Sequence, residues 1–146
     1  MKIINVLRLS FLPYSTDAGL LVLRLWLGLS LFLLHGLSKL KGFSEMSKQF
    51  PDPVGMGPAT SLSLAIFAEV VCALLLAMGL FTRLAAAVLV VQMAVAFFLV
   101  HKTVLSGPQS GELAFIYLAG FVTILIVGPG KFALDAKAGS SKTRGK

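Results

Sequence analysis

The stretch AGLLVLRLWLGLSLFLLHGLS, from Ala18 to Ser38, decides the fold class of this chain. Its only titratable residues are Arg24 and His35. A helix rises about 1.5 Å per residue, so this stretch reaches about 30 Å, the thickness of the hydrocarbon core of a bilayer. It therefore predicts a transmembrane helix. A signal peptide is the alternative, because Lys2 and Arg8 precede the stretch, but no small-residue cleavage site follows it.

The composition of the whole chain is typical of a membrane protein. Of its 146 residues, 57% are hydrophobic and 13% are charged, whereas soluble domains carry about 25% charged residues. With a mean hydropathy of +0.91, the chain has too few polar side chains to cover a water-facing surface. We therefore expect an all-α fold that is integral to the lipid bilayer.

Three further apolar stretches follow, and two of the connections between them are polar loops with proline and glycine. They run from about Thr60 to Phe81, from Leu84 to Val100 and from Leu113 to Val127. Together with the first stretch, they predict a bundle of four transmembrane helices. An even number of spans returns both termini to the same side of the membrane.

The chain is predicted to have three regions. Residues 1–17 form an N-terminal segment, and residues 18–130 form the transmembrane domain. Residues 131–146 form a basic tail, which we expect to be disordered because it is rich in glycine, serine and lysine.

The distribution of basic residues predicts the orientation, because cytoplasmic segments carry an excess of Lys and Arg. Outside the spans, eight basic residues fall on the side of the termini and four on the other side, so both termini are predicted to be cytoplasmic. The eight are Lys2, Arg8, Arg83, Lys131, Lys137, Lys142, Arg144 and Lys146, and the four are Lys39, Lys41, Lys48 and Lys102.

Several classes of function find no support in the sequence. The net charge of +7 reflects membrane topology rather than a nucleic-acid partner, since the basic residues lie in short loops and the tail. Cys72 is the only cysteine, so neither an internal disulfide nor a CxxC dithiol can form. The GPGK sequence at residues 128–131 lacks the rest of a P-loop, and no GxGxxG motif is present.

The first candidate site is intramembrane and consists of Arg24, His35 and Glu69. Charged groups at bilayer depth cost about 2.5 to 3.5 kcal/mol each, so Arg24 and Glu69 are expected to form an ion pair. The pair either sets the register of two helices or forms the floor of a pocket that binds a head group or moves protons. Alternatively, Arg24 extends to the interface alone and leaves Glu69 unpaired. His35 follows Arg24 by about three helical turns, so the two share a face.

The second candidate site is a layer near the outer surface, formed by Lys39, His101 and Glu112. Two histidines and a carboxylate are ligand types for a metal, and two histidines can ligate haem. No HxxxH or ExxH spacing is present, so no metal site is predicted. Interfacial histidines that hydrogen-bond to backbone or lipid are the simpler interpretation.

Three segments of the chain resemble the DoxX family of small bacterial membrane proteins. They are RLWLGLSLFLLHGLSKLKGF at residues 24–43, AEVVCALLLAMGLFTRLAAA at residues 68–87 and GELAFIYLAGFVTILIVGPGKFALD at residues 111–135. The family's conserved positions are matched by Arg24, Gly28, His35, Gly36, Lys39, Ala68, Glu69, Gly79, Leu80, Thr82, Arg83, Gly128, Pro129 and Gly130. The departures are Val71 and Cys72, where glycines are common, and Ala133, which replaces a frequent serine.

The resemblance implies a protein of the bacterial inner membrane that acts in a redox context, because the family takes its name from a quinol oxidase and a thiosulfate:quinone oxidoreductase. It implies a membrane subunit or partner of a quinone-linked system, with quinone at the layer of Arg24, His35 and Glu69. No intrinsic cofactor motif supports catalysis by this chain alone. The alternatives are a noncatalytic scaffold or assembly factor and a small-molecule transporter acting as an oligomer. The expected partners are the bilayer, a redox protein or further copies of the chain.

Overall fold

The computed structural model describes residues 2–11 and 13–140, and these residues form helices joined by turns and loops, with no strand among them. The elements are α1 (Lys2–Leu7), α2 (Thr16–Leu31), η1 (Phe32–Gly36), α3 (Leu37–Lys41), α4 (Phe43–Met46), α5 (Pro58–Ile66), η2 (Phe67–Cys72), α6 (Ala73–Met78), α7 (Thr82–Ala94), η3 (Val95–Val100), α8 (Glu112–Val127) and α9 (Leu134–Ser140), where η denotes a π-helical segment. Several consecutive elements join into longer continuous helices.

Three continuous helices are long and apolar enough to cross a membrane, namely Thr16–Lys41, Pro58–Met78 and Thr82–Val100. The fourth apolar helix, α8, has 16 residues and therefore reaches about 24 Å. The all-α fold is confirmed, and the four helices lie where the four apolar stretches predict them. A membrane crossing by α8 stays a prediction, because this helix is shorter than the other three.

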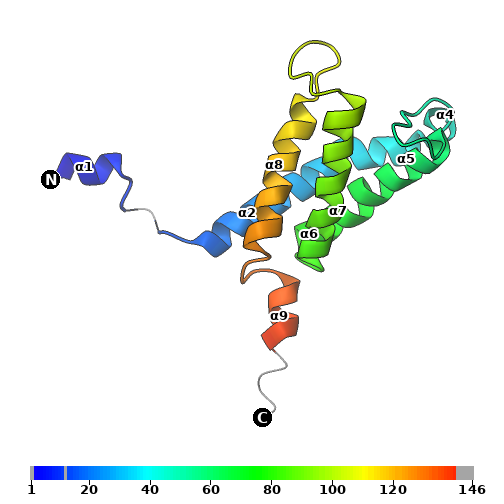
Figure 1. Ribbon diagram of the computed structural model, residues 1–146. Coiled ribbons are helices and arrows are strands. Elements are labelled where there is room, and N and C mark those ends of the chain that lie inside the picture. Colours follow the sequence, from blue (N-terminus) through cyan, green and yellow to red (C-terminus); the bar gives the residue numbers. More distant parts are fainter. Residues whose placement is uncertain (1, 12, 141–146) are drawn as a thin grey trace.

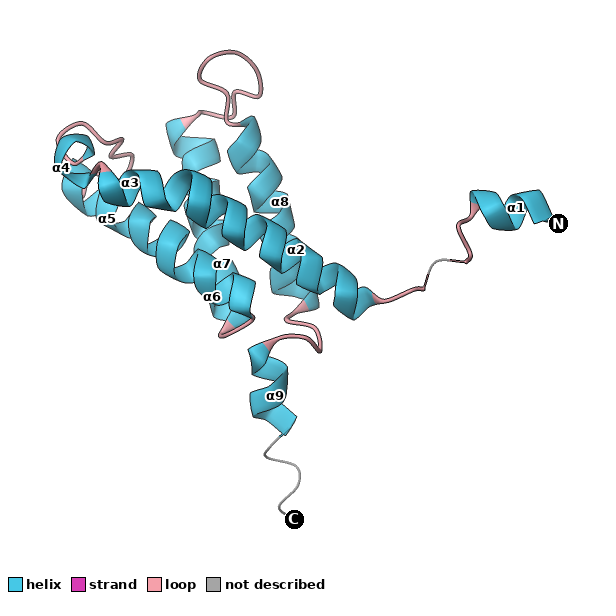
Figure 2. Ribbon diagram, turned by 180° about the vertical axis from the view of Figure 1, so that it is seen from behind, coloured by secondary structure: helices cyan, strands magenta, loops and turns pink. Residues whose placement is uncertain are grey.

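The long helices pack in two antiparallel pairs. The continuous helix of α2, η1 and α3 runs beside that of α5, η2 and α6 (Figure 2), and α7 runs beside α8 (Figure 1). Both pairs contribute buried side chains to one core, including Leu31, Leu76, Leu89 and Phe121.

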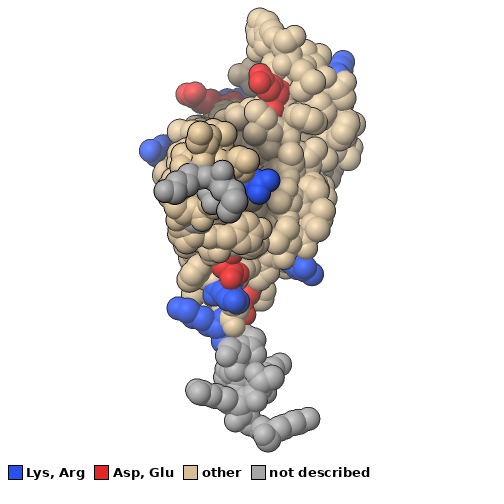
Figure 3. All heavy atoms as spheres, turned by 90° about the vertical axis from the view of Figure 1, so that its left-hand side faces the viewer, with Lys and Arg blue, Asp and Glu red and all other residues tan. Residues whose placement is uncertain are grey.

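The outer faces of the helices are apolar as well. Trp26 on α2 is 74% exposed, and Leu84 on α7 and Ile126 on α8 are also exposed. Apart from the N-terminal segment that projects toward the viewer, the charged side chains in Figure 3 gather toward the two ends of the bundle. This distribution is the one expected of helices that face lipid along their sides.

We name the two ends of the bundle by their connections. The turn end carries the α6–α7 turn, residues 79–81, and the segment that follows α8. The loop end carries the connections of residues 42–57 and 101–111.

The sequence predicts a disordered tail from residue 131 onward, but the structure shows a helix in the first part of this segment. Residues 134–140 form α9, and Ala133 before it is completely buried. The Asp135 carboxylate accepts hydrogen bonds of 2.8 Å from the backbone N–H groups of Phe81 and Thr82, at the start of α7. The first N–H groups of a helix have no partner within the helix, so this carboxylate satisfies them and anchors the segment. Residues 141–146 of the predicted tail lie outside the described residues.

Candidate functional site

An ion pair joins the first two long helices. The Lys39 ammonium on α3 lies 2.5 Å from the Glu69 carboxylate on η2. The two side chains are only 17% and 6% exposed, respectively. The expected Arg24–Glu69 pair is therefore wrong, because Lys39 occupies the position at Glu69 that the sequence analysis assigned to Arg24.

The relative shift of the two helices explains why Lys39 reaches Glu69. Gly36 lies directly against the backbone of Glu69, and a Cβ atom at Gly36 would be 2.6 Å from the Glu69 carbonyl oxygen. Only glycine permits so close an approach. Lys39 follows Gly36 by three residues, so its side chain projects near Glu69. Arg24 lies twelve residues before Gly36, too far along the helix to make the same contact.

Both sides of this contact are π-helical. η1 carries His35 and Gly36, η2 carries Glu69, and the two segments pack against each other. Single π-helical turns inside α-helices occur frequently at functional sites. The polar residues of the first candidate site other than Arg24 therefore lie on locally widened helix turns in the middle of the bundle.

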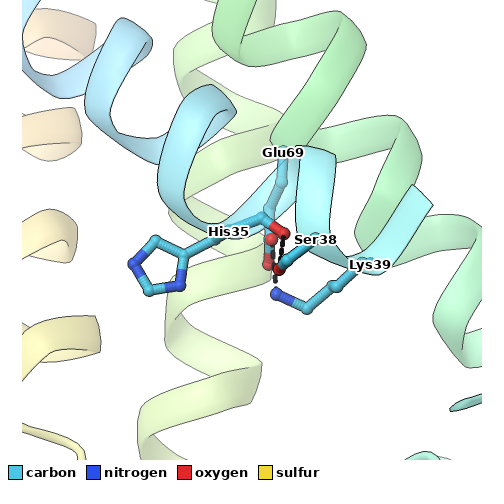
Figure 4. A network of polar contacts seen from close by, with 4 residues as sticks. All are labelled: His35, Ser38, Lys39 and Glu69. Carbon is cyan, nitrogen blue, oxygen red and sulfur yellow. Dashed lines mark hydrogen bonds and ion pairs between the residues drawn. The ribbon is translucent and has the colours of Figure 1, made fainter. Parts of the chain in front are cut away.

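His35 points away from the ion pair. Figure 4 shows its ring directed toward α8, whereas its backbone carbonyl accepts a hydrogen bond of 2.8 Å from the Ser38 hydroxyl. The ring meets Tyr117 of α8 edge to face, with 6.3 Å between the ring centroids. The Tyr117 hydroxyl lies 2.8 Å from the Ser30 hydroxyl of α2. A hydrogen bond therefore joins Ser30 to Tyr117, and a ring contact joins Tyr117 to His35. We call these three residues the α2–α8 cluster.

The α2–α8 cluster borders an open groove on the outer side of the first helix. Ser30 belongs to both, since it contacts Tyr117 and also lines the groove. The Ser30 hydroxyl donates a hydrogen bond of 2.6 Å to the Trp26 carbonyl, so the Tyr117 hydroxyl donates to Ser30. The groove has a volume of about 470 Å³ and is lined by Val22, Leu25, Trp26, Leu29, Ser30, Leu33 and Leu34.

Arg24 is completely buried near the turn end of the bundle. Its Nη1 lies 3.4 Å from the Leu76 carbonyl oxygen, and Nε and Nη2 have no hydrogen-bond partner among the described residues. The carboxylate that acts electrostatically on Arg24 is Asp135. Arg24 therefore does not pair with Glu69; its guanidinium reaches Gly79 in the α6–α7 turn, and it lies apart from His35 along the helix.

The second candidate site is not assembled into one cluster. His101 Nδ1 lies 2.9 Å from the Gln109 carbonyl oxygen, and Glu112 is exposed at the start of α8. In the part of the chain that the structure describes, no hydrogen bond or ion pair joins Lys39 to either residue. The same part contains no group of three or more His, Cys, Asp or Glu residues that could hold a metal ion.

Sequence reasoning did not identify Ser30, Trp26 or Asp135 as site residues. Ser30 and Trp26 are one helical turn apart in an otherwise apolar stretch. This spacing could have indicated that the two residues share one face of the helix. No spacing rule connects Asp135 with Phe81, because more than fifty residues separate them in the chain.

Comparison with known proteins identifies relatives of this chain. A family model described as DoxX matches residues 19–102, a range that contains Ser30, His35, Lys39 and Glu69. A protein of Haemophilus influenzae, described as uncharacterized, is 38% identical over 112 residues, which cover 73% of this chain and 81% of the relative. No solved structure matches the chain.

Proposed function

Because this chain belongs to the DoxX family of membrane proteins, we propose that it is a membrane subunit or partner of a quinone-linked redox system. The observation that supports this proposal is the α2–α8 cluster at the border of the groove. A bound quinone would supply the two-electron, two-proton carrier chemistry of such a system. The electrons would come from a redox protein docked on this chain.

The groove residues match the chemistry of a quinone in two respects. Most of the lining is apolar, which suits a hydrocarbon tail, and Trp26 offers a flat aromatic surface to a ring. Ser30 can rotate its hydroxyl from the Trp26 carbonyl to a ligand carbonyl and still accept the hydrogen bond from Tyr117. The groove therefore combines one adjustable donor with an apolar surface.

His35 is the residue of the α2–α8 cluster whose ring can both accept and release a proton. Its ring lies against Tyr117, and the Tyr117 hydroxyl in turn contacts Ser30. In the proposed function, Ser30 orients the quinone, Tyr117 holds Ser30, and His35 is the terminal proton-exchanging group. The Lys39–Glu69 pair, on the other side of η1, fixes the helix that carries His35.

The proposed location is the bacterial inner membrane, with α8 as the fourth span and both termini in the cytoplasm. Two observations support this topology. The side chains of Ala114, Tyr117, Phe121 and Ile124 are buried, so α8 is an integral part of the bundle. The basic residues are also more numerous on the side of the termini. A helix of about 24 Å spans a bilayer that thins locally.

A noncatalytic scaffold or assembly factor is the second candidate function. The Lys39–Glu69 pair favours it, because this pair connects two helices without requiring any ligand. In that case the apolar face of α2 would contact only lipid or a partner helix.

Quinone binding can be tested through Trp26, because it is the only tryptophan of the chain and lines the groove. The full chain in lipid nanodiscs is titrated with decylubiquinone, and tryptophan fluorescence is recorded. We expect saturable quenching. Loss of one hydrogen bond of about 1 kcal/mol in Ser30→Ala should weaken apparent binding about fivefold. Ser63→Ala is the matched control, since the Ser63 hydroxyl donates a hydrogen bond to the Ala59 carbonyl of its own helix α5 and does not line the groove. Binding should be unchanged in this variant.

Linear, non-saturable quenching that is identical in the wild type, Ser30→Ala and Ser63→Ala would exclude a quinone site in this groove. Purification from the native membrane in mild detergent, followed by mass spectrometry, then separates the two candidate functions. A co-purified redox protein supports the redox role, whereas recovery of non-redox partners alone supports the scaffold.

A further inference from the structure

The N-terminal segment exposes an unusual amount of apolar surface. Figures 1 and 2 show α1 projecting away from the bundle, far from every other helix. Large apolar side chains that are exposed over more than half of their surface follow one another along this short segment. They are Ile3, Ile4, Val6, Leu7, Leu9, Phe11 and Tyr14, the last of which is 97% exposed. Apolar surface costs about 25 cal/mol per Å² in water, so a segment with these residues favours an apolar phase.

The residues of this segment are arranged for an interface rather than for a protein core. Ile3, Ile4 and Leu7 follow the spacing of one helix face, and α1 is helical over this range. The polar residues of the same stretch recur at every third sequence position, as Lys2, Asn5 and Arg8. A helix gathers residues at this spacing on one side. The segment is therefore amphipathic and carries cations among its polar residues.

The place where the segment joins the bundle determines which interface it can reach. Ser15 caps the N-terminus of α2 by accepting a hydrogen bond of 3.2 Å from the Ala18 N–H. The helix that begins at Thr16 is one of those long enough to cross a membrane. The N-terminal segment therefore leaves the first span where that span emerges from the bilayer.

The same end of the bundle carries further positive charge. The Lys131 side chain is 86% exposed beside Asp17, with 3.6 Å between its ammonium nitrogen and the carboxylate. Lys137 on α9 is exposed as well. A surface with exposed cations at the level of the head groups attracts anionic lipids, at about 1 kcal/mol per Lys or Arg.

We propose that residues 2–11 lie on the membrane surface at the turn end as an interfacial anchor that recognises anionic lipid head groups. Ile3, Leu7 and their apolar neighbours enter the boundary between head groups and acyl chains, and the exposed Arg8 contacts the head groups. This inference does not depend on the proposed redox function. It assigns to the N-terminal segment a partner of its own, the lipid surface.

The test places a nitroxide spin label on the full chain in nanodiscs of phosphatidylcholine and phosphatidylglycerol. Leu7→Cys is compared with Asn5→Cys, both in a Cys72→Ala background. The label at position 7 should be more accessible to oxygen than to a water-soluble nickel chelate, and the label at position 5 should show the reverse. If Cys72→Ala does not fold, native Cys72 can be retained, because it is buried.

Two outcomes would overturn the interfacial position. Equal access of the nickel chelate to both labels would place the segment in water, and protection of position 7 from both reagents would mean that it packs against protein. The lipid specificity has its own readout. Arg8→Gln should reduce the surface-bound population about fivefold relative to the free one, and nanodiscs of phosphatidylcholine alone should reduce it at least as much. An unchanged population in both would exclude recognition of anionic head groups.

Discussion

At the scale of single residues, the stability of this molecule depends on the buried carboxylate of Glu69. This carboxylate is almost completely buried and takes its counter-ion from Lys39 of the neighbouring helix. Glu69→Gln would leave the Lys39 ammonium without that counter-ion. Removing one partner of a fully buried pair costs about 3 to 5 kcal/mol. Because the Lys39 side chain is partly exposed, we expect a smaller loss of about 1 to 3 kcal/mol in the free energy of unfolding. Denaturant unfolding in detergent micelles, followed by circular dichroism, measures it.

The control for this change removes both charges together. Lys39→Met combined with Glu69→Gln leaves no uncompensated ammonium, so the double variant should be more stable than Glu69→Gln alone. If the losses of the two single variants simply add, the pair contributes no interaction free energy and its structural role is refuted.

At the scale of elements, α7 depends on a carboxylate supplied from beyond α8. Partial burial acts to raise the pKa of Asp135, but hydrogen bonds from Thr82 and Phe81 and the charge of Arg24 outweigh it. The pKa of Asp135 therefore lies below its ordinary value of 3.8. A carboxyl with a depressed pKa in the folded state contributes stability that is present above its unfolded pKa. That stability is lost as the pH falls through the lower, folded pKa.

Asp135→Ala should consequently lower the free energy of unfolding by about 1 kcal/mol at neutral pH, the usual cost of a lost helix cap. It should also remove the loss of stability that protonation of Asp135 causes as the pH falls below about 4. Thermal unfolding measured at neutral pH and at acid pH gives both quantities. Glu45→Ala, which removes an exposed carboxylate on α4, should change neither. Wild-type stability and pH dependence in Asp135→Ala would show that this contact does not anchor α7.

At the scale of the whole molecule, the proposed topology is tested by two single cysteines that flank α8. In a Cys72→Ala background, Ser106→Cys lies in the loop before α8, and Lys137→Cys lies on α9 after it; both positions are exposed. In intact bacterial cells, a membrane-impermeant maleimide should label position 106 only. Position 137 should react only after the membrane is permeabilised. Labelling of both positions in intact cells would mean that α8 does not cross, and labelling of position 137 alone would invert the topology.

The existence of the long helices and their approximate limits could be predicted from the sequence alone. Apolar stretches of sufficient length and the glycine and proline residues between them are local properties, and a helix satisfies its backbone within the segment. The family could also be recognised from sequence, because its motifs are contiguous in the chain. The partner of each buried charge could not be predicted in this way. The ordered structure of residues 131–140 could not be predicted either.

Only the tertiary structure determined which polar groups meet. Glu69 pairs with Lys39 rather than Arg24 because the close contact at Gly36 sets the relative shift of two antiparallel helices. Ser30 meets Tyr117, and Asp135 caps α7, across large separations in the chain. A side-chain partner depends on the rotation and displacement of whole packed helices, and neither quantity is contained in the local pattern of residues.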